Sequence, residues 1–150
     1  MTYHLAQINI ARLLKPIDHP QIADFVNALD EINAIADQAP GFIWRLVSDD
    51  GNDATEFRPY EDDNIIVNVS VWQDVESLKT YTYRSDHVSF FIRRKEWFEP
   101  FKTAHIALWW IPAGEMPSAE EAVARLEHLR QHGPTPYAFT ITKPLPPPSD

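Results

Sequence analysis

The sequence predicts an α+β domain in which a split β-α-β arrangement with an antiparallel sheet is followed by an extra C-terminal helix. The first observation is the order of the elements. Segments with the period of strands and segments with the period of helices follow one another as strand, helix, strand, strand, helix, strand, helix. The second is the length, because 150 residues suit one domain with a substantial core. The third is that no repeat or linker divides the chain, so residues 1–142 are expected to form a single domain.

The first strand and the first helix are identified by their periods. Residues 3–12 alternate between an apolar side and a side that carries Gln7 and Asn9. Residues 20–38 repeat apolar side chains at helical spacing, and they begin with a proline that suits the first helical position. A Pro-Gly pair follows at once and is expected to end the helix.

Residues 42–47 are expected to form a short second strand, and residues 65–72 form the third, which has the clearest alternation in the chain. One face of the third strand is wholly β-branched, as suits a buried sheet surface. The opposite face carries Ile66, Asn68, Ser70 and Trp72.

The second half of the chain supplies the remaining elements. Asp74 is expected to cap a short helix, residues 83–98 to add a second helical piece, and residues 105–111 to form the fourth strand. The segment Ser118–Glu121 is a capping box for the C-terminal helix, and a Gly-Pro pair at Gly133 ends that helix. Two further segments are expected to close the chain, an edge strand at residues 138–142 and an extended, loose, proline-rich tail at residues 143–150.

The composition excludes several classes of function. A formal net charge of -9 repels phosphate backbones, so no nucleic-acid binding is expected, and three consecutive cations at residues 93–95 are expected to be a solvated helix face. The chain has no cysteine, which fits a reducing compartment. No apolar run approaches the roughly 18 residues needed to cross a bilayer, so no membrane contact is expected. A cytoplasmic protein is the plain inference.

The predicted sheet has one face that is unusually apolar for a solvated surface. Trp72 and Leu5 lie on it among the polar residues, and this is more apolar area than a sheet face leaves exposed to water. Pairing this face with a second copy of the chain would cover it. The sequence therefore predicts a homodimer through the face that bears Asn68, Ser70 and Trp72.

Several motifs resemble a known family. Over residues 3–142 the chain resembles the DUF3291 family of bacterial proteins, whose function is unknown. More widely, the positions of Asn9, Trp72 and His87 resemble those in the dimeric α/β-barrel superfamily, which includes antibiotic-biosynthesis and haem-degrading monooxygenases. The motifs that carry the family resemblance are HLAQINIARL, NALDEINAIAD, PGFIWRL, NVSVW, YRSDHVSFFIRRKEWF, ALWWIPAG and HGPTPYAF.

The resemblance implies a ferredoxin-like subunit whose sheet joins a partner's sheet around a cavity. Members of this superfamily that oxygenate without a cofactor act on electron-rich phenolic or anthrone substrates, which give an electron to dioxygen themselves. Such a protein supplies a dry pocket, polar groups that hold the substrate anion, and a base. The haem-degrading members use an asparagine, a tryptophan and a histidine. Asn9 matches the first of these, but Tyr81 and Phe91 stand in the other two places, so neither haem degradation nor a cofactor is expected.

His87 has two interpretations. It is either a half-buried histidine satisfied by one hydrogen bond or a general base with a pKa near neutrality, oriented by Tyr83 one helical turn earlier. With Asn9 it forms the candidate catalytic pair. The polar residues of the sheet have two interpretations as well, since they bond either across a dimer interface or to a ligand. The candidate ligand-binding residues are Gln7, Trp44, Asn68, Ser70, Trp72 and Tyr83.

Two hypotheses for the function follow. The first is a cofactor-independent, monooxygenase-like enzyme that acts on a flat, electron-rich metabolite. The second is a non-catalytic dimeric module that binds an aromatic ligand or haem. Two points stay open, namely whether Trp109 or Trp110 of the fourth strand faces the cavity and whether side chains fill that cavity. No metal site is predicted, because His128 and His132 have a suitable spacing but no third ligand.

Overall fold

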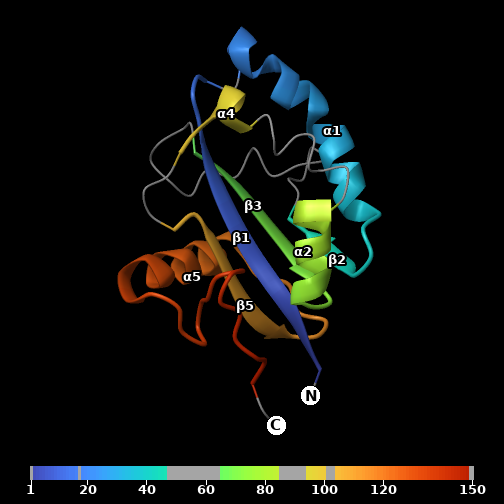
Figure 1. The fold of residues 1–150 in the computed structure, drawn as a ribbon, viewed down its shortest axis with the longest axis vertical. Coiled ribbons are helices and arrows are strands. Elements are labelled where there is room, and N and C mark those ends of the chain that lie inside the picture. The colour runs from blue at the N-terminus through green and yellow to red at the C-terminus, as the bar shows by residue number, and fades with distance from the viewer. Residues whose placement is uncertain (1, 17, 47–64, 85–93, 101–103, 149–150) are drawn as a thin grey trace.

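The fold is described by a computed structural model that covers residues 2–16, 18–46, 65–84, 94–100 and 104–148. The predicted order of strands and helices is confirmed, and the fold is α+β (Figure 1). The elements are β1 (Tyr3–Leu13), the 3-10 helix η1 (Pro20–Ile22), α1 (Ala23–Asp37), β2 (Phe42–Arg45), β3 (Ile65–Trp72), α2 (Val75–Arg84), α4 (Arg94–Trp97), β4 (Phe98–Glu99), β5 (Ile106–Pro112) and α5 (Ala119–His132).

The sheet has the predicted split β-α-β topology. Strand β3 lies between β2 and β1 and is antiparallel to both, so β1 and β2 run parallel with β3 inserted between them. The other edge of β1 pairs with β5 along Tyr3–Asn9 and with β4 at its last two residues. Strand β4 has only two residues, and the sequence did not predict it. The antiparallel ferredoxin-like arrangement is therefore confirmed.

Local signals in the sequence set the ends of two helices. The His19 Nδ1 atom accepts a hydrogen bond from the backbone N–H of Gln21 at 3.0 Å, which starts η1 and leads into α1. The Ser118 hydroxyl accepts one from the N–H of Glu121 at 3.1 Å, as expected for the predicted capping box of α5. The predicted helix over residues 20–38 is thus one 3-10 turn followed by the α-helix.

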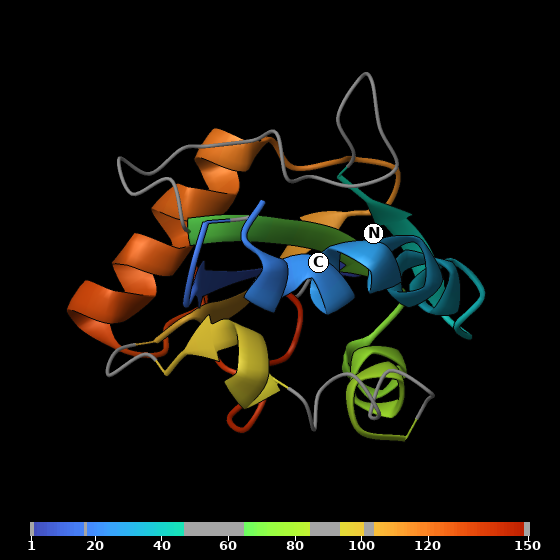
Figure 2. The same ribbon diagram turned by 90° about the horizontal axis from the view of Figure 1, so that it is seen from above.

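Helix α5 covers part of the β-branched face of the sheet. Its Ala122, Leu126 and Leu129 are buried against this face, in one cluster with side chains of β1, β3 and β5. Both Ile8 and Val69, in the centre of the face, are fully buried. Figure 2 shows the sheet nearly edge-on, with α5 on one side and α2 and α4 on the other.

The opposite face of the sheet is covered by the same chain, whereas the sequence suggested that a second copy would cover it. Leu5 and Trp72 are 0 % and 1 % exposed, because Leu78 of α2 and Phe139 of the C-terminal segment pack with them in one cluster. At the far end of this face, side chains of η1, α1 and α4 bury Leu13. The exposed apolar area that suggested a homodimer through this face is therefore covered without a second copy, and the homodimer itself stays a prediction.

The C-terminal segment lies along the edge of β5. Leu108 and Phe139 exchange two backbone hydrogen bonds of 2.9 and 2.8 Å, so the edge strand expected at residues 138–142 pairs with β5 through a single bridge. Beyond it, the carbonyl of Leu145 accepts a hydrogen bond of 2.8 Å from the indole N–H of Trp110. The start of the expected loose tail is thus held against the sheet. None of the helices described here is long and apolar enough to span a membrane.

Candidate functional site

Four polar side chains meet in the middle of the face that α2 and α4 cover. The register of β1 and β3 sets Gln7 opposite Ser70 and Asn9 opposite Asn68. All four point to the same side of the sheet, because side chains two residues apart on a strand share a face. We call these four residues the polar strip.

The polar strip is tied together by its own hydrogen bonds. The Gln7 amide donates to Asn68 Oδ1 at 2.8 Å and to the Ser70 hydroxyl at 2.7 Å. The Asn9 amide donates to Gln7 Oε1 at 3.1 Å and to Asn68 Oδ1 at 3.2 Å. Both amide groups use all their N–H donors, so neither side chain can rotate without losing two bonds.

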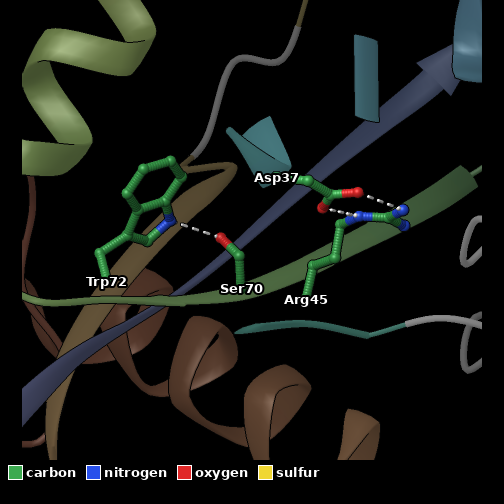
Figure 3. Close-up of polar contacts among 4 residues, drawn as sticks. All are labelled: Asp37, Arg45, Ser70 and Trp72. Carbon is green, nitrogen blue, oxygen red and sulfur yellow. Dashed lines mark hydrogen bonds and ion pairs between the residues drawn. The ribbon is translucent and has the colours of Figure 1, made fainter. Parts of the chain in front are cut away.

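The buried end of the strip is anchored by Trp72. Its indole N–H donates a 2.8 Å hydrogen bond to the Ser70 hydroxyl, and both side chains rise from the same side of β3 (Figure 3). Gln7 and Ser70 are only 4 % and 5 % exposed, whereas Asn9 and Asn68 are half-buried. The strip therefore has a closed end and an accessible end.

The accessible end retains groups that can bind a ligand. Within the described residues, the Asn68 Nδ2 amide and the Asn9 Oδ1 oxygen have no hydrogen-bond partner. Asn68 is held in place because its oxygen accepts two hydrogen bonds, so its N–H donors are fixed as well. The strip thus offers a fixed donor next to an acceptor, which suits a ligand with neighbouring carbonyl and hydroxyl oxygens.

At the buried end of the strip, Trp72 packs against two other aromatic rings. Its ring centroid lies 5.4 Å from that of Phe42, nearly at a right angle, and 5.0 Å from that of Tyr81, in a tilted stack. These contacts and its exposure of 1 % leave Trp72 inside the core. Trp72 is one of the predicted ligand-binding residues. In the structure it is buried, and its indole N–H orients the Ser70 hydroxyl.

The Tyr81 phenol next to this tryptophan has a shifted pKa. Burial raises the pKa of Tyr81 to about 12, and this effect exceeds that of the nearby Arg45 guanidinium, which lowers it; the Asp37 carboxylate raises it slightly. The phenol is therefore protonated at neutral pH. It can donate a hydrogen bond there but cannot serve as a base.

This shift predicts a pH dependence of stability. A folded-state pKa above the ordinary value of 10.0 means that folding favours the protonated phenol. The stabilisation is complete below pH 10 and is lost as the pH rises from about 10 to about 12, by up to roughly 2–3 kcal/mol. Urea unfolding across this range should show a loss in the wild type that exceeds the loss in Tyr81→Phe by this amount, because the other tyrosines and the lysines titrate in both proteins. Equal slopes for the two proteins would contradict the assigned shift.

A charged pair that the sequence did not reveal lies beside the strip. Arg45 stands opposite Ser70 in the register of β2 and β3. Its guanidinium makes two hydrogen bonds with the Asp37 carboxylate, of 2.8 and 3.2 Å, and its side chain is only 8 % exposed (Figure 3). Because Asp37 neutralises this cation, the pair adds no net charge beside the strip.

Trp44 does not lie with the other predicted ligand-binding residues. The register shifts between Phe42 and Trp44, so Phe42 and Arg45 point to the side of the strip while Trp44 points to the opposite side. There Trp44 packs against the cluster that α5 covers. The same alternation resolves the open point about β5, since Trp110 faces the side of the strip and Trp109 the side of α5.

The structure thus brings together Gln7, Asn9, Asn68, Ser70 and Trp72. Tyr83 belongs to α2, but its side chain lies outside the described part of the structure, and so does all of His87. Their predicted roles stay predictions. The rings of His128 and His132 are 4.5 Å apart on α5, and no group of three possible metal ligands exists among the described residues.

A separate hollow of about 570 Å³ lies on α5, on the other side of the sheet from the strip. It is open to solvent and does not adjoin the polar strip. Its lining residues are Ala124, Glu127, His128, Gln131 and Tyr137.

Comparisons with known proteins show the family and the fold. The model of the domain of unknown function DUF3291 matches residues 4–150, as the sequence motifs indicated. No curated protein matches the chain. Among solved structures, the chain is similar to the NE2512 protein of unknown function from Nitrosomonas europaea, with 11 % identity over 79 % of this chain and 98 % of that one and a TM-score of 0.51.

Two further solved structures are similar. PA3566 from Pseudomonas aeruginosa shares 12 % identity over 74 % of this chain and 94 % of its own, with a TM-score of 0.50. SnoaB, a cofactor-independent oxygenase from Streptomyces nogalater, shares 14 % identity over 75 % of this chain and 95 % of its own, with a TM-score of 0.49. At these identities the likeness concerns the fold alone.

Proposed function

Because this chain belongs to the DUF3291 family, for which no function is known, we propose a function from its polar strip: it binds a flat, electron-rich molecule there and oxygenates it without a cofactor. The observation that carries the proposal is the accessible end of the strip. There Asn68 presents fixed N–H donors and Asn9 an acceptor oxygen, both without a partner among the described residues. The buried end, closed by Trp72, fixes their positions.

The strip suits a phenolic or ketonic ligand. A ligand carbonyl or phenolate oxygen accepts from Asn68, and a neighbouring hydroxyl donates to Asn9. The donors are already oriented, so they stabilise a developing oxyanion without reorganisation. Half-buried Ile66 and Ile106 flank the two asparagines on the same face and offer apolar contact for a flat ring system.

The base has to come from outside the strip. The amides and the hydroxyl of the strip do not titrate near neutral pH, and Tyr81, with a pKa of about 12, is already protonated. We assign the role to His87, whose imidazole takes the proton from the bound phenol or acidic carbon. The resulting anion, held by Asn68, passes an electron to dioxygen.

Oxygen uptake in the presence of flat phenols and anthrones tests the proposal. We expect protein-dependent consumption of dioxygen without added metal or flavin. His87→Gln should lower turnover by ~10²–10⁴-fold, as expected for the loss of a general base. The matched control, His132→Gln on the exposed end of α5, should leave turnover unchanged. Asn68→Leu should weaken ligand binding.

One observation favours a second function. The strip holds its hydrogen bonds without any titratable side chain, as a binding site does when it performs no chemistry. In that case the chain is a binding module for an aromatic ligand. The binding module predicts that the ligand binds, that Asn68→Leu abolishes this binding, and that His87→Gln does not affect it. If these results come without oxygen uptake, they favour the binding module over the enzyme.

A further inference from the structure

A segment of the chain after α5 returns to the face of the sheet that carries the polar strip. It runs from Phe139 to Leu145, and we call it the strap. We propose that the strap is a wall of the ligand site, and that its Ile141 limits how far a bound ring system can extend. The proposal rests on the proposed function in taking the polar strip as the ligand site, but it does not depend on whether the ligand is oxygenated.

The strap is attached to β5 at its first residue. Phe139 and Leu108 form an antiparallel bridge and exchange two backbone hydrogen bonds of 2.9 and 2.8 Å. The Phe139 side chain is 0 % exposed and packs in one cluster with Leu5 and Trp72, on the side of the strip. Figure 2 shows the C-terminal end of the chain on the side of the sheet that α2 and α4 cover. The strap therefore extends this face by one strand position beyond β5.

Ile141 lies toward the accessible end of the strip. Because the bridge is antiparallel, the chain after Phe139 runs toward the start of β5, where Ile106 stands opposite Asn9. Ile141 and Ile106 are both half-buried and pack against the same buried cluster. A row thus crosses the face from Asn68 through Asn9 and Ile106 to Ile141.

Hydrogen bonds on both sides of Ile141 hold it in position. The Lys143 N–H donates to the carbonyl and to the hydroxyl of Thr140, at 3.3 and 3.1 Å, and so closes a turn around Ile141. After this turn, the Leu145 carbonyl accepts the 2.8 Å hydrogen bond from the indole N–H of Trp110. A ligand therefore meets Ile141 on a segment that is tied down at its start, at its turn and at its end.

The spacing of the strands gives the length that a ligand can have. Neighbouring strands are about 4.8 Å apart, so two spacings, from β1 across β5 to the strap, are roughly 10 Å. A flat ligand whose oxygen is held by Asn9 and Asn68 lies over Ile106 and meets Ile141 after about two to three fused rings. The ligand class is therefore bicyclic and tricyclic phenols and ketones, and longer ring systems are rejected.

Binding of a ligand series to Ile141 variants tests the proposal. The probes are 1-naphthol, anthrone and a tetracyclic analogue of anthrone, titrated by calorimetry under nitrogen so that none is oxidised. The wild type should bind the tetracyclic ligand at least ~10-fold more weakly than anthrone. Ile141→Ala should remove this difference. Ile141→Trp should weaken anthrone binding by ~10-fold or more and leave naphthol binding unchanged.

The same two substitutions at Ile43 are the matched control. Ile43 is an exposed isoleucine on the edge strand β2, and it is not in the row that leads to the strap. Ile43→Ala and Ile43→Trp should leave all three affinities as in the wild type. Thermal unfolding should show that each variant is folded, and if Ile141→Trp is not, the alanine variant alone decides.

The outcomes separate this proposal from the proposed function. An unchanged preference in the Ile141 variants, or a wild type that binds the tetracyclic ligand as tightly as anthrone, would overturn the role of the strap. A wild type that binds none of the three ligands would overturn the polar strip as the ligand site and the wall with it. A shifted preference without oxygen uptake in air would support the wall and speak against the oxygenase.

Discussion

Replacement of Gly41 by alanine is expected to lower the free energy of unfolding by roughly 2–5 kcal/mol. Gly41 has a φ of 82°, a left-handed conformation that strains any residue with a Cβ atom. A Cβ at this position would also overlap the Cβ and Oγ atoms of Ser77. Ser77 cannot move aside freely, since its N–H and hydroxyl both bond Asp74 at 2.8 Å and so fix the first turn of α2.

The consequence of this substitution reaches the candidate site. The Gly41 carbonyl accepts a 2.7 Å hydrogen bond from Gln73, directly after β3, so the turn before β2 is packed against the start of α2. A displaced α2 would lift Leu78 and Tyr81 from Trp72. Ligand binding at the polar strip is therefore expected to weaken together with stability.

Chemical denaturation of two glycine variants separates the backbone strain in Gly41→Ala from the overlap of its Cβ atom with Ser77. Gly114 also has a positive φ, of 95°, but a Cβ there meets nothing within 4 Å. Gly114→Ala should therefore show the conformational strain alone, about 1–2 kcal/mol. Adding Ser77→Gly to Gly41→Ala should recover the part that comes from the overlap. Equal losses for the two single variants would show that the contact with Ser77 does not matter.

The long, regular strands could be predicted from the sequence because their side chains alternate over many residues. In β1 and β3 the alternation fixes which residues share a face, and this was enough to place Gln7, Asn9, Asn68 and Ser70 together. Strand β4, with two residues, is too short to show a period. The irregularity in β2 is equally invisible in the sequence, because two aromatic residues in four give no sign of a register shift. The sequence therefore did not show that Trp44 points away from the polar strip.

The covering of the sheet could not be predicted from periodicity. The apolar stripe of α5 shows that the helix packs on something, but the stripe does not say on which face of the sheet. The proline-rich composition of residues 143–150 suggested a loose tail. The backbone carbonyl of Leu145 nevertheless accepts a hydrogen bond from the indole N–H of Trp110, and composition gives no information about backbone acceptors of this kind. The ion pair of Arg45 and Asp37 joins residues from β2 and α1 and follows only from their packing.

The largest stability loss among side-chain truncations near the site is expected for Trp72→Ala, about 3–5 kcal/mol. The indole is 1 % exposed and contacts the rings of Phe42 and Tyr81, so its removal leaves a cavity that the sheet cannot close. The Ser70 hydroxyl loses its indole donor at the same time. Water that enters the cavity should also reach Tyr81 and bring the pKa of its phenol down from about 12 toward 10.

Trp72→Phe is the matched control, because it keeps an aromatic ring between Phe42 and Tyr81 and removes the N–H that reaches Ser70. Urea unfolding should place its loss well below that of Trp72→Ala, since a single hydrogen bond contributes about 0.5–1.5 kcal/mol. Absorbance titration of the phenols should find the Tyr81 pKa still raised in Trp72→Phe. If phenylalanine is as damaging as alanine, the hydrogen bond to Ser70 holds this end of the strip in place. If both variants are nearly neutral, Trp72 does not anchor the strip, and the fixed orientation of Asn68 needs another cause.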